Sequence, residues 1–192
     1  MNYVTYQAEG IPISQFGTGS PPVGSNYISI SAAQLATVEA NPGAWCVIGS
    51  ALSNYSAPAA EQLAAAQKSQ IKMISAGCAT TIVSGFTSSA LGAAYAYPSK
   101  EGGENHDQIN LIGAYGNSLN PANASTWTTK FWCCDASGSW AFRAHTAAQI
   151  QQVFSDGAAR KIACIEQNAA LSAQVMAAAD VASVQAIVWV AP

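Results

Sequence analysis

The sequence predicts an α+β protein: a small β-rich N-terminal module followed by a helix-rich domain with long amphipathic helices and an inserted β-hairpin. Two observations lead to this fold class. Residues 1–55 contain short β-branched and aromatic runs separated by turns rich in glycine and proline. Residues 56–192 contain two long segments whose apolar residues recur at helical spacings. We therefore expect two domains, 1–55 and 56–192.

The first domain reads as strands, turns and one short helix. Strands are expected at 3–6, 27–30 and 44–48. Ser31 is placed to cap a helix over 32–39, because its hydroxyl can accept from the free amides of the first turn, and Asn41-Pro42-Gly43 ends that helix. Glycines and prolines exclude regular structure from 17–25, and residues 53–58 read as a linker.

Two long helices and two short ones are expected in the second domain. The first, over 57–83, carries a narrow apolar stripe that suits packing within the domain or coiled-coil self-association: Leu63, Ile71, Ile74, Cys78 and Ile82. A shorter helix covers 105–118, and the second long helix starts after the N-cap Thr146. Its predicted core stripe is Ala147, Ile150, Phe154, Ala158, Ile162, Ile165 and Ala169. Asp180 caps a last helix.

A β-hairpin is expected between these helices, with strands at 126–134 and 139–144 around the turn residues Asp135-Ala136-Ser137-Gly138. Alternate residues of a strand share a face, so Phe131 and Trp132 must point in opposite directions. One face can then pack on the helices while the other meets a protein partner or stacks on a sugar ring. The candidate interface residues are Trp127, Trp132, Trp140 and Phe142; the alternative is that most of the rings around the hairpin, these four and Phe131, are core.

Low charge is the most informative feature of the composition. The 192 residues include 7 Lys and Arg and 10 Asp and Glu, so 9% are charged, against roughly 25% in a typical globular chain. Alanine (39 residues) and Ser, Thr, Asn and Gln (54 together) replace them. Such a surface suits a homo-oligomer or an assembly subunit covered by other chains; the alternative is the Ala/Ser/Thr-rich habit of some extracellular and viral proteins.

Other features of the sequence argue against several function classes. A net charge of −3 with scattered Lys and Arg argues against a nucleic-acid partner. The sequence contains no run of about 18 apolar residues, so no membrane span is predicted. No secretory signal is visible at the start of the chain. The five cysteines form no C-x-x-C pair, so we expect buried, reduced thiols made in a cytoplasm rather than a metal site.

Catalytic and cofactor-binding groups are not predicted. His106-Asp107 reads as a pair at a helix N-terminus, and His145 as a buried hydrogen-bonding residue that fixes the junction of hairpin and helix. Nothing in the sequence brings two carboxylates together across a cleft, so a glycan hydrolase is a minor alternative. The acids that lie in or near loops are Glu101, Glu104, Asp107 and Asp135.

The order of motifs in residues 60–190 resembles a domain of unknown function common in tail-fibre and tail-fibre-assembly proteins of tailed bacteriophages. The segments that carry the resemblance are 85–97, Asp107–Gly113, the Trp-rich hairpin Phe131–Trp140, His145–Gln149 and Val184–Trp189. The N-terminal module, with its Ser20–Gly24 loop, is more loosely similar to the start of tail-fibre-assembly proteins.

The resemblance implies a non-enzymatic virion protein of the phage tail, made in the host bacterial cytoplasm. Its first module would dock on tail-fibre or baseplate proteins, and its second domain would be the tail-fibre-associated part. Two alternatives stay open: a tail-fibre assembly chaperone, and a receptor-binding tip that recognises a host surface glycan through the Trp-rich hairpin. No catalytic, cofactor or metal residues come with the resemblance.

Overall fold

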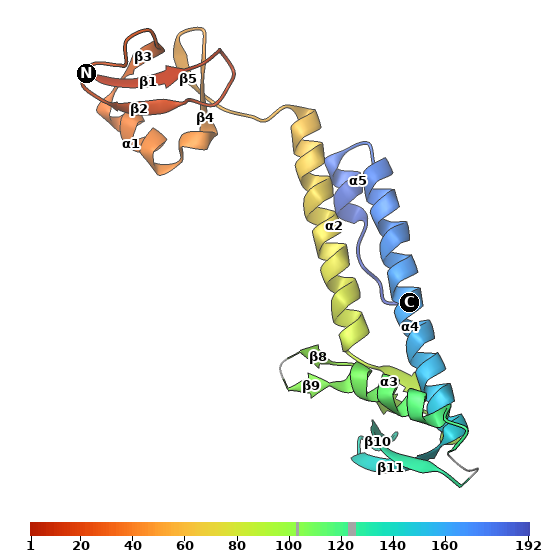
Figure 1. Cartoon of the computed structure of the whole chain (residues 1–192). Helices are drawn as coiled ribbons and strands as arrows, with labels where there is room; N and C mark the ends of the chain where they lie inside the picture. The colour runs from red at the N-terminus through yellow and green to blue at the C-terminus, as the bar shows by residue number, and fades with distance from the viewer. Residues whose placement is uncertain (103, 123–125) are drawn as a thin grey trace. The chain divides into compact units, whose positions relative to one another are not determined.

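A computed structural model describes residues 1–102, 104–122 and 126–192. These residues form two compact units, Met1–Glu61 and Gln62–Pro192, whereas the sequence places the boundary at 55 and 56. Each unit combines strands with helices, the second being dominated by helices (Figure 1). The predicted α+β class is therefore confirmed.

The first unit packs two small antiparallel sheets and a helix around one core. Its elements are β1 (Asn2–Tyr6), β2 (Gln15–Thr18), β3 (Asn26–Ile30), α1 (Ala32–Ala40), the 3-10 turn η1 (Pro42–Ala44), β4 (Trp45–Ile48) and β5 (Ala51–Asn54). The central strand β1 pairs with β2 on one side and β3 on the other, and β4 pairs with β5. The buried core consists of Val4, Ile13, Ile30, Leu35, Val38 and Val47.

The structure confirms the prediction for α1 but not the linker predicted where β5 lies. Ser31 caps α1 as predicted, in a reciprocal capping box with Gln34. Residues 53 and 54, expected in a linker, instead belong to β5. Gly49 (φ 56°) and Ser50 (φ 63°) both adopt the left-handed conformation, and a two-residue turn of this kind folds β5 back onto β4.

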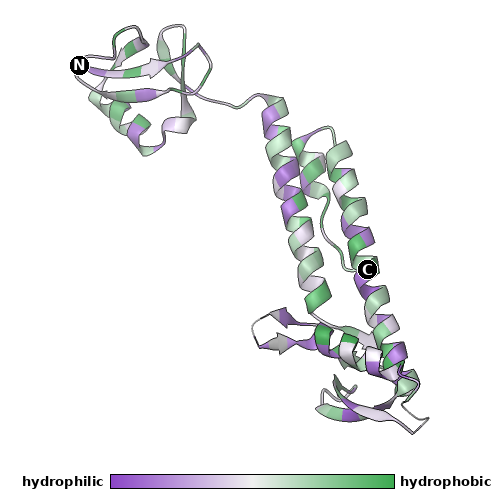
Figure 2. Ribbon diagram, viewed as in Figure 1, coloured by the Kyte–Doolittle hydropathy of each residue, from purple (hydrophilic) through white to green (hydrophobic). Residues whose placement is uncertain are grey.

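The second unit is built on two long antiparallel helices that lie side by side, α2 (Ala59–Val83) and α4 (Ala147–Ala177) (Figure 1). Hydrophobic residues are spread along both helices (Figure 2). The Cys78 thiol of α2 donates to the Cys164 carbonyl of α4 at 3.4 Å. The core shared by the two helices includes Ile74, Leu171, Val175 and Val184, the last from the short helix α5 (Val181–Ala186).

The predicted stripe of α2 is confirmed at Ile74 and Cys78, which are buried, but the predicted stripe of α4 is wrong in its second half. Ile162 and Ile165 are 55% and 50% exposed. Three successive four-residue steps from Ile150 to Ile162 turn the stripe by about a third of a helical turn, away from the core. The side chains that stay on the buried face are Ile150, Val153, Cys164, Leu171 and Val175.

A four-stranded antiparallel sheet and α3 (Asp107–Ser118) pack at the start of α4. The strand order is β11-β10-β7-β6. The strands are β6 (Phe86–Ser88), β7 (Tyr95–Tyr97), β10 (Thr128–Cys134) and β11 (Trp140–Thr146), with a separate two-stranded β8 (Glu101–Gly102) and β9 (Asn105–His106). Tyr97, Leu111, Cys133 and Val153 form the core of this region.

All five cysteines are buried and unpaired, as predicted. Among the described residues, no helix has the length and hydropathy needed to cross a membrane.

The chain after α5 runs back along α2 and is held there by side-chain hydrogen bonds. Gln70 Nε2 donates to the Ile187 carbonyl at 2.5 Å, and Trp189 Nε1 donates to Thr81 Oγ1 at 2.9 Å. The Trp189 ring lies directly on Gly77, where an added Cβ would approach the ring to 2.6 Å. Gly77 is therefore required for the close approach of this segment to α2.

Gly77→Ala should lower the free energy of unfolding by about 1–3 kcal/mol, because the new methyl group overpacks the contact with Trp189. In an open helical position the same change is favourable by about 1 kcal/mol. Gly116→Ala in α3, where no atom lies within 4 Å of the added Cβ, is the matched control. Urea unfolding followed by circular dichroism compares the two; equal stability of both variants would contradict the packing described.

Candidate functional site

The turn of the β10–β11 hairpin is held by Asp135. Its Oδ1 accepts hydrogen bonds from the amides of Ser137 at 3.0 Å and Ser139 at 3.1 Å, and Gly138 takes a left-handed φ of 84°. Hydrogen bonds from the Ser137 side chain and the Ser139 amide lower the pKa of the Asp135 carboxyl, so it stays ionised at neutral pH. The predicted hairpin and its turn are thus confirmed.

Arg143 ties the two strands of the hairpin together. Its Nη2 pairs with Asp135 Oδ2 at 2.5 Å, and its Nη1 donates to the Cys133 carbonyl at 2.8 Å. The guanidinium also lies 5.1 Å from the centre of the Tyr95 ring, which links the hairpin to β7. This is the one ion pair in the part of the chain that the structure describes.

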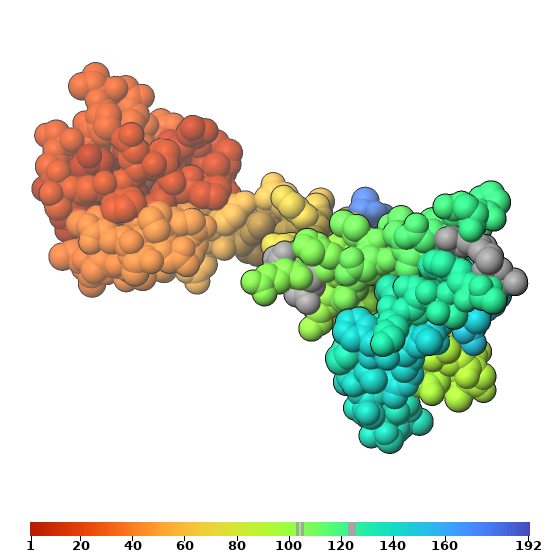
Figure 3. Space-filling model, turned by 60° about the horizontal axis from the view of Figure 1, so that its bottom comes forward, coloured from red at the N-terminus to blue at the C-terminus, as the bar shows by residue number. Residues whose placement is uncertain are grey.

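The register of the hairpin separates its two faces as predicted. Trp132 pairs with Phe142 and Cys133 with Ala141, so residues on alternate positions share a face across both strands. The packed face holds Phe131, Cys133 and His145. On the opposite face Trp132, Trp140 and Phe142 are exposed, and the hairpin lies at the surface of the second unit (Figure 3).

Trp132, Trp140 and Phe142 form a cluster on this open side, which we call the aromatic face. The Trp132 and Trp140 rings are stacked at 6.1 Å between centroids, and Trp132 lies 4.8 Å from Phe142. Their exposed fractions are 39%, 45% and 66%. Three of the four candidate interface residues are therefore together on the surface, and the alternative that most of these rings are core is wrong.

Trp127, the fourth candidate, is not part of this cluster. It precedes β10 and is half-buried. Within the described residues no ring contact joins it to the aromatic face. Residues 123–125 lie outside the described residues.

His145 anchors the packed face, as predicted. Its Nδ1 is 2.8 Å from the Arg143 carbonyl, which can only accept, so Nδ1 carries the proton. Its Nε2 then accepts from the Tyr97 hydroxyl at 2.8 Å. Burial lowers the pKa of His145 and raises that of Tyr97, so both are neutral and serve as a structural pair rather than as an exposed acid or base.

Two of the other titratable candidates, Asp107 and Glu101, accept hydrogen bonds from backbone amides. Asp107 at the start of α3 accepts from the Lys100 amide at 2.9 Å, and Glu101 accepts from the Ile109 amide at 2.8 Å. His106 is exposed and immediately precedes α3. Over the described residues, no three His, Cys, Asp or Glu side chains gather in a group able to hold a metal ion.

Sequence reasoning missed two hollows beside the sheet. One, of about 410 Å³, brings Trp140 of the aromatic face together with Thr87, Tyr97 and Arg160. The other, of about 180 Å³, lies between α3 and α4. Their lining residues come from segments up to 79 positions apart (Ile82 and Lys161 in the smaller), and no local sequence pattern marks them.

A family model described as a domain of unknown function, DUF4376, matches residues 59–188. No curated protein and no solved structure matches the chain.

The buried neutral His145 predicts a loss of stability in mild acid. The unfolded chain takes up a proton at His145 near its ordinary pKa of about 6.5, while the folded chain resists protonation until a lower pH. The free energy of unfolding should therefore fall as pH drops from 7.5 to about 5.5, a window above most carboxyl titrations.

The free energy of unfolding of His145→Gln, measured with urea, should lose most of this pH dependence, although the variant is less stable at every pH. His106→Gln, which replaces the exposed histidine, should keep the dependence of the parent protein. The opposite pattern in the two variants would remove His145 as its cause.

Proposed function

The chain belongs to the DUF4376 family, and we propose that it is a non-enzymatic subunit of a bacteriophage tail that binds a neighbouring protein through its aromatic face. The subunit is associated with the tail fibre or the baseplate and docks on a neighbouring tail or fibre protein. The resemblance of residues 60–190 to domains of tail-fibre proteins motivates the virion assignment.

The exposed Trp132, Trp140 and Phe142 are the observation that carries the proposal. Tryptophan and phenylalanine are enriched where protein interfaces bury their central contacts. The rings project from a hairpin held by the Arg143–Asp135 pair and the buried His145, so little conformational freedom is lost when a partner covers them.

Further exposed apolar side chains support assembly with additional copies or neighbours. Ile162 and Ile165 on α4 and Ile109 and Ile112 on α3 are each half or more exposed. A chain with 9% charged residues offers few charges to keep such surfaces apart. Homo-oligomer formation is therefore part of the proposal.

A binding role also agrees with the positions of the groups that could act as acids or bases. His145 is sealed in the core, and the Asp135 carboxylate is engaged by the hairpin turn and Arg143. Asp107 and Glu101 accept from backbone amides.

Mass spectrometry of purified phage particles tests the proposal. We expect the protein in particles at a small fixed multiple of three or six copies, measured against the capsid protein. In a phage that carries only the variant gene, Phe142→Ser should reduce its copy number about tenfold or more, because the most exposed ring of the aromatic face is lost.

Val190→Ser, which removes an apolar side chain that is 62% exposed in the second unit away from the aromatic face, is the matched control and should be incorporated normally. Circular dichroism confirms that both variants fold. Absence of the parent protein from particles, with presence in the infected-cell lysate, would replace the structural role by that of a tail-fibre assembly chaperone.

A second candidate function, recognition of a host surface glycan, is favoured by one observation. Trp140 belongs to the aromatic face and also lines the larger hollow, where Thr87 and Arg160 supply polar groups beside a ring that can stack on a sugar. Trp140→Ala particles that contain the normal copy number but no longer adsorb to host cells would favour this function over docking.

A further inference from the structure

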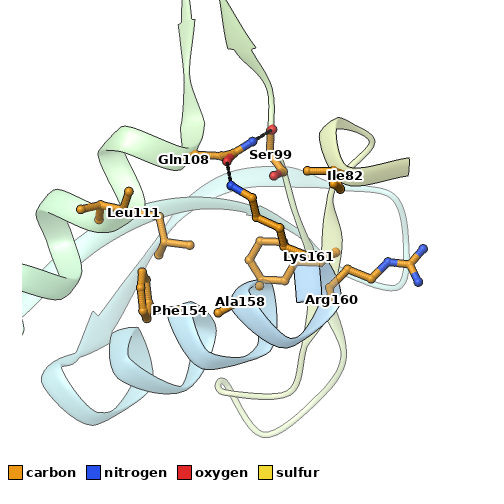
Figure 4. Close-up of a pocket in the computed structure, with 11 residues that line it drawn as sticks. Ile82, Ser99, Gln108, Leu111, Phe154, Ala158, Arg160 and Lys161 are labelled. Atoms are coloured by element: carbon orange, nitrogen blue, oxygen red, sulfur yellow. Dashed lines mark hydrogen bonds between the residues drawn. The ribbon is translucent and has the colours of Figure 1, made fainter. Parts of the chain in front are cut away.

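The smaller hollow is an apolar pocket on a different part of the second unit. It encloses about 180 Å³ between the end of α2, β6, α3 and α4 (Figure 4). None of its lining residues belongs to the aromatic face. Its apolar walls are Ile82, Phe86, Leu111, Ile112, Phe154 and Ala158.

The walls of this pocket are held in place by the core behind them. Phe154 stacks on Tyr115 with 4.0 Å between ring centroids, and Phe86 stacks on Tyr97 at 5.6 Å. Phe86 also presses on Gly157 of α4, where an added Cβ would come within 2.8 Å of the ring. The pocket is therefore preformed, and an occupant would not need to reorganise it.

Its size suits a single side chain. An apolar cavity of about 150 Å³ accommodates one benzene molecule, whereas drug-sized ligands occupy about 300–1,000 Å³. Ile112 is 57% exposed at the pocket, so apolar surface is already open to water there. One phenyl ring or branched aliphatic group would cover it.

A lysine side chain crosses the mouth of the pocket (Figure 4). Lys161 Nζ lies 3.4 Å from Gln108 Oε1, and Gln108 Nε2 in turn donates to the Ser99 carbonyl at 2.9 Å. No carboxylate pairs with Lys161 in the described portion of the chain. An ammonium without a carboxylate partner at the edge of an apolar pocket is complementary to an apolar group that carries a negative charge beside it.

We propose that this pocket binds a peptide segment of a partner protein that inserts one Phe, Leu or Ile side chain and places a Glu or Asp carboxylate against Lys161. The segment is a second docking point, independent of the aromatic face and of the function proposed above. Apolar anchors that fill a pocket are the contacts on which protein interfaces depend most.

Fluorescence polarisation with labelled, capped dodecapeptides tests the proposal on the full chain. Each peptide has a Ser/Gly background, one central Phe, Leu or Ile, and one flanking Glu or Lys. We expect the Glu peptides to bind at least about tenfold more tightly than the Lys peptides, and also than Glu peptides with Ala at the centre.

Two variants with matched controls locate the binding. Ala158→Phe fills the pocket and should abolish binding, while Ala159→Phe, on the next and exposed position of α4, should not. Lys161→Glu should reverse the preference from Glu peptides to Lys peptides. Lys72→Glu, at an exposed position of α2, should leave the preference unchanged. If Ala158→Phe does not fold, the reversal by Lys161→Glu decides alone.

Three results would overturn the proposal: equal binding of peptides with and without the apolar residue, unchanged binding by both pocket variants, or binding of free 3-phenylpropionate as tight as that of the peptides. The last would make the pocket a small-molecule site. Phe142→Ser should bind the Glu peptides normally, so failure of the aromatic-face proposal and failure of this one are distinguishable.

Discussion

The buried hydrogen bond between Tyr97 and His145 is the constraint on which the sheet end of the second unit depends. His145 lies on β11 and Tyr97 on β7, so their 2.8 Å contact reaches across β10 and ties the two strands together on the buried face of the sheet. Both groups are removed from water, and each satisfies a polar atom of the other. An unpaired donor or acceptor here would cost about 1–3 kcal/mol.

The positions of the surfaces with candidate functions follow from this hydrogen bond. Because side chains alternate along a strand, a hairpin that must turn His145 inward must turn Trp132, Trp140 and Phe142 outward. Tyr97 also supports Phe86, and Phe86 forms a wall of both hollows. A single buried pair thus orients the aromatic face and supports the apolar pocket.

The local elements could be predicted because their causes lie within a few residues. Ser31, Thr146 and Asp180 each cap a helix by accepting from an amide three residues later, a contact encoded by adjacent sequence. The outward position of Trp132 follows from strand alternation in the same way. Residues 51–54 were missed because their pairing with β4 depends on a turn with Ser50 in the left-handed conformation, which serine rarely adopts.

By itself, the sequence determined the α+β class, the helix caps, the hairpin turn and the opposite directions of Phe131 and Trp132, since these depend on short-range geometry and side-chain period. Only the tertiary structure decided that Ile162 and Ile165 face outward, that Trp127 stands apart from the other aromatic candidates, and that Ile82, Gln108 and Lys161 border one pocket. Those outcomes depend on which helix face meets which neighbour, and packing between distant segments settles that choice.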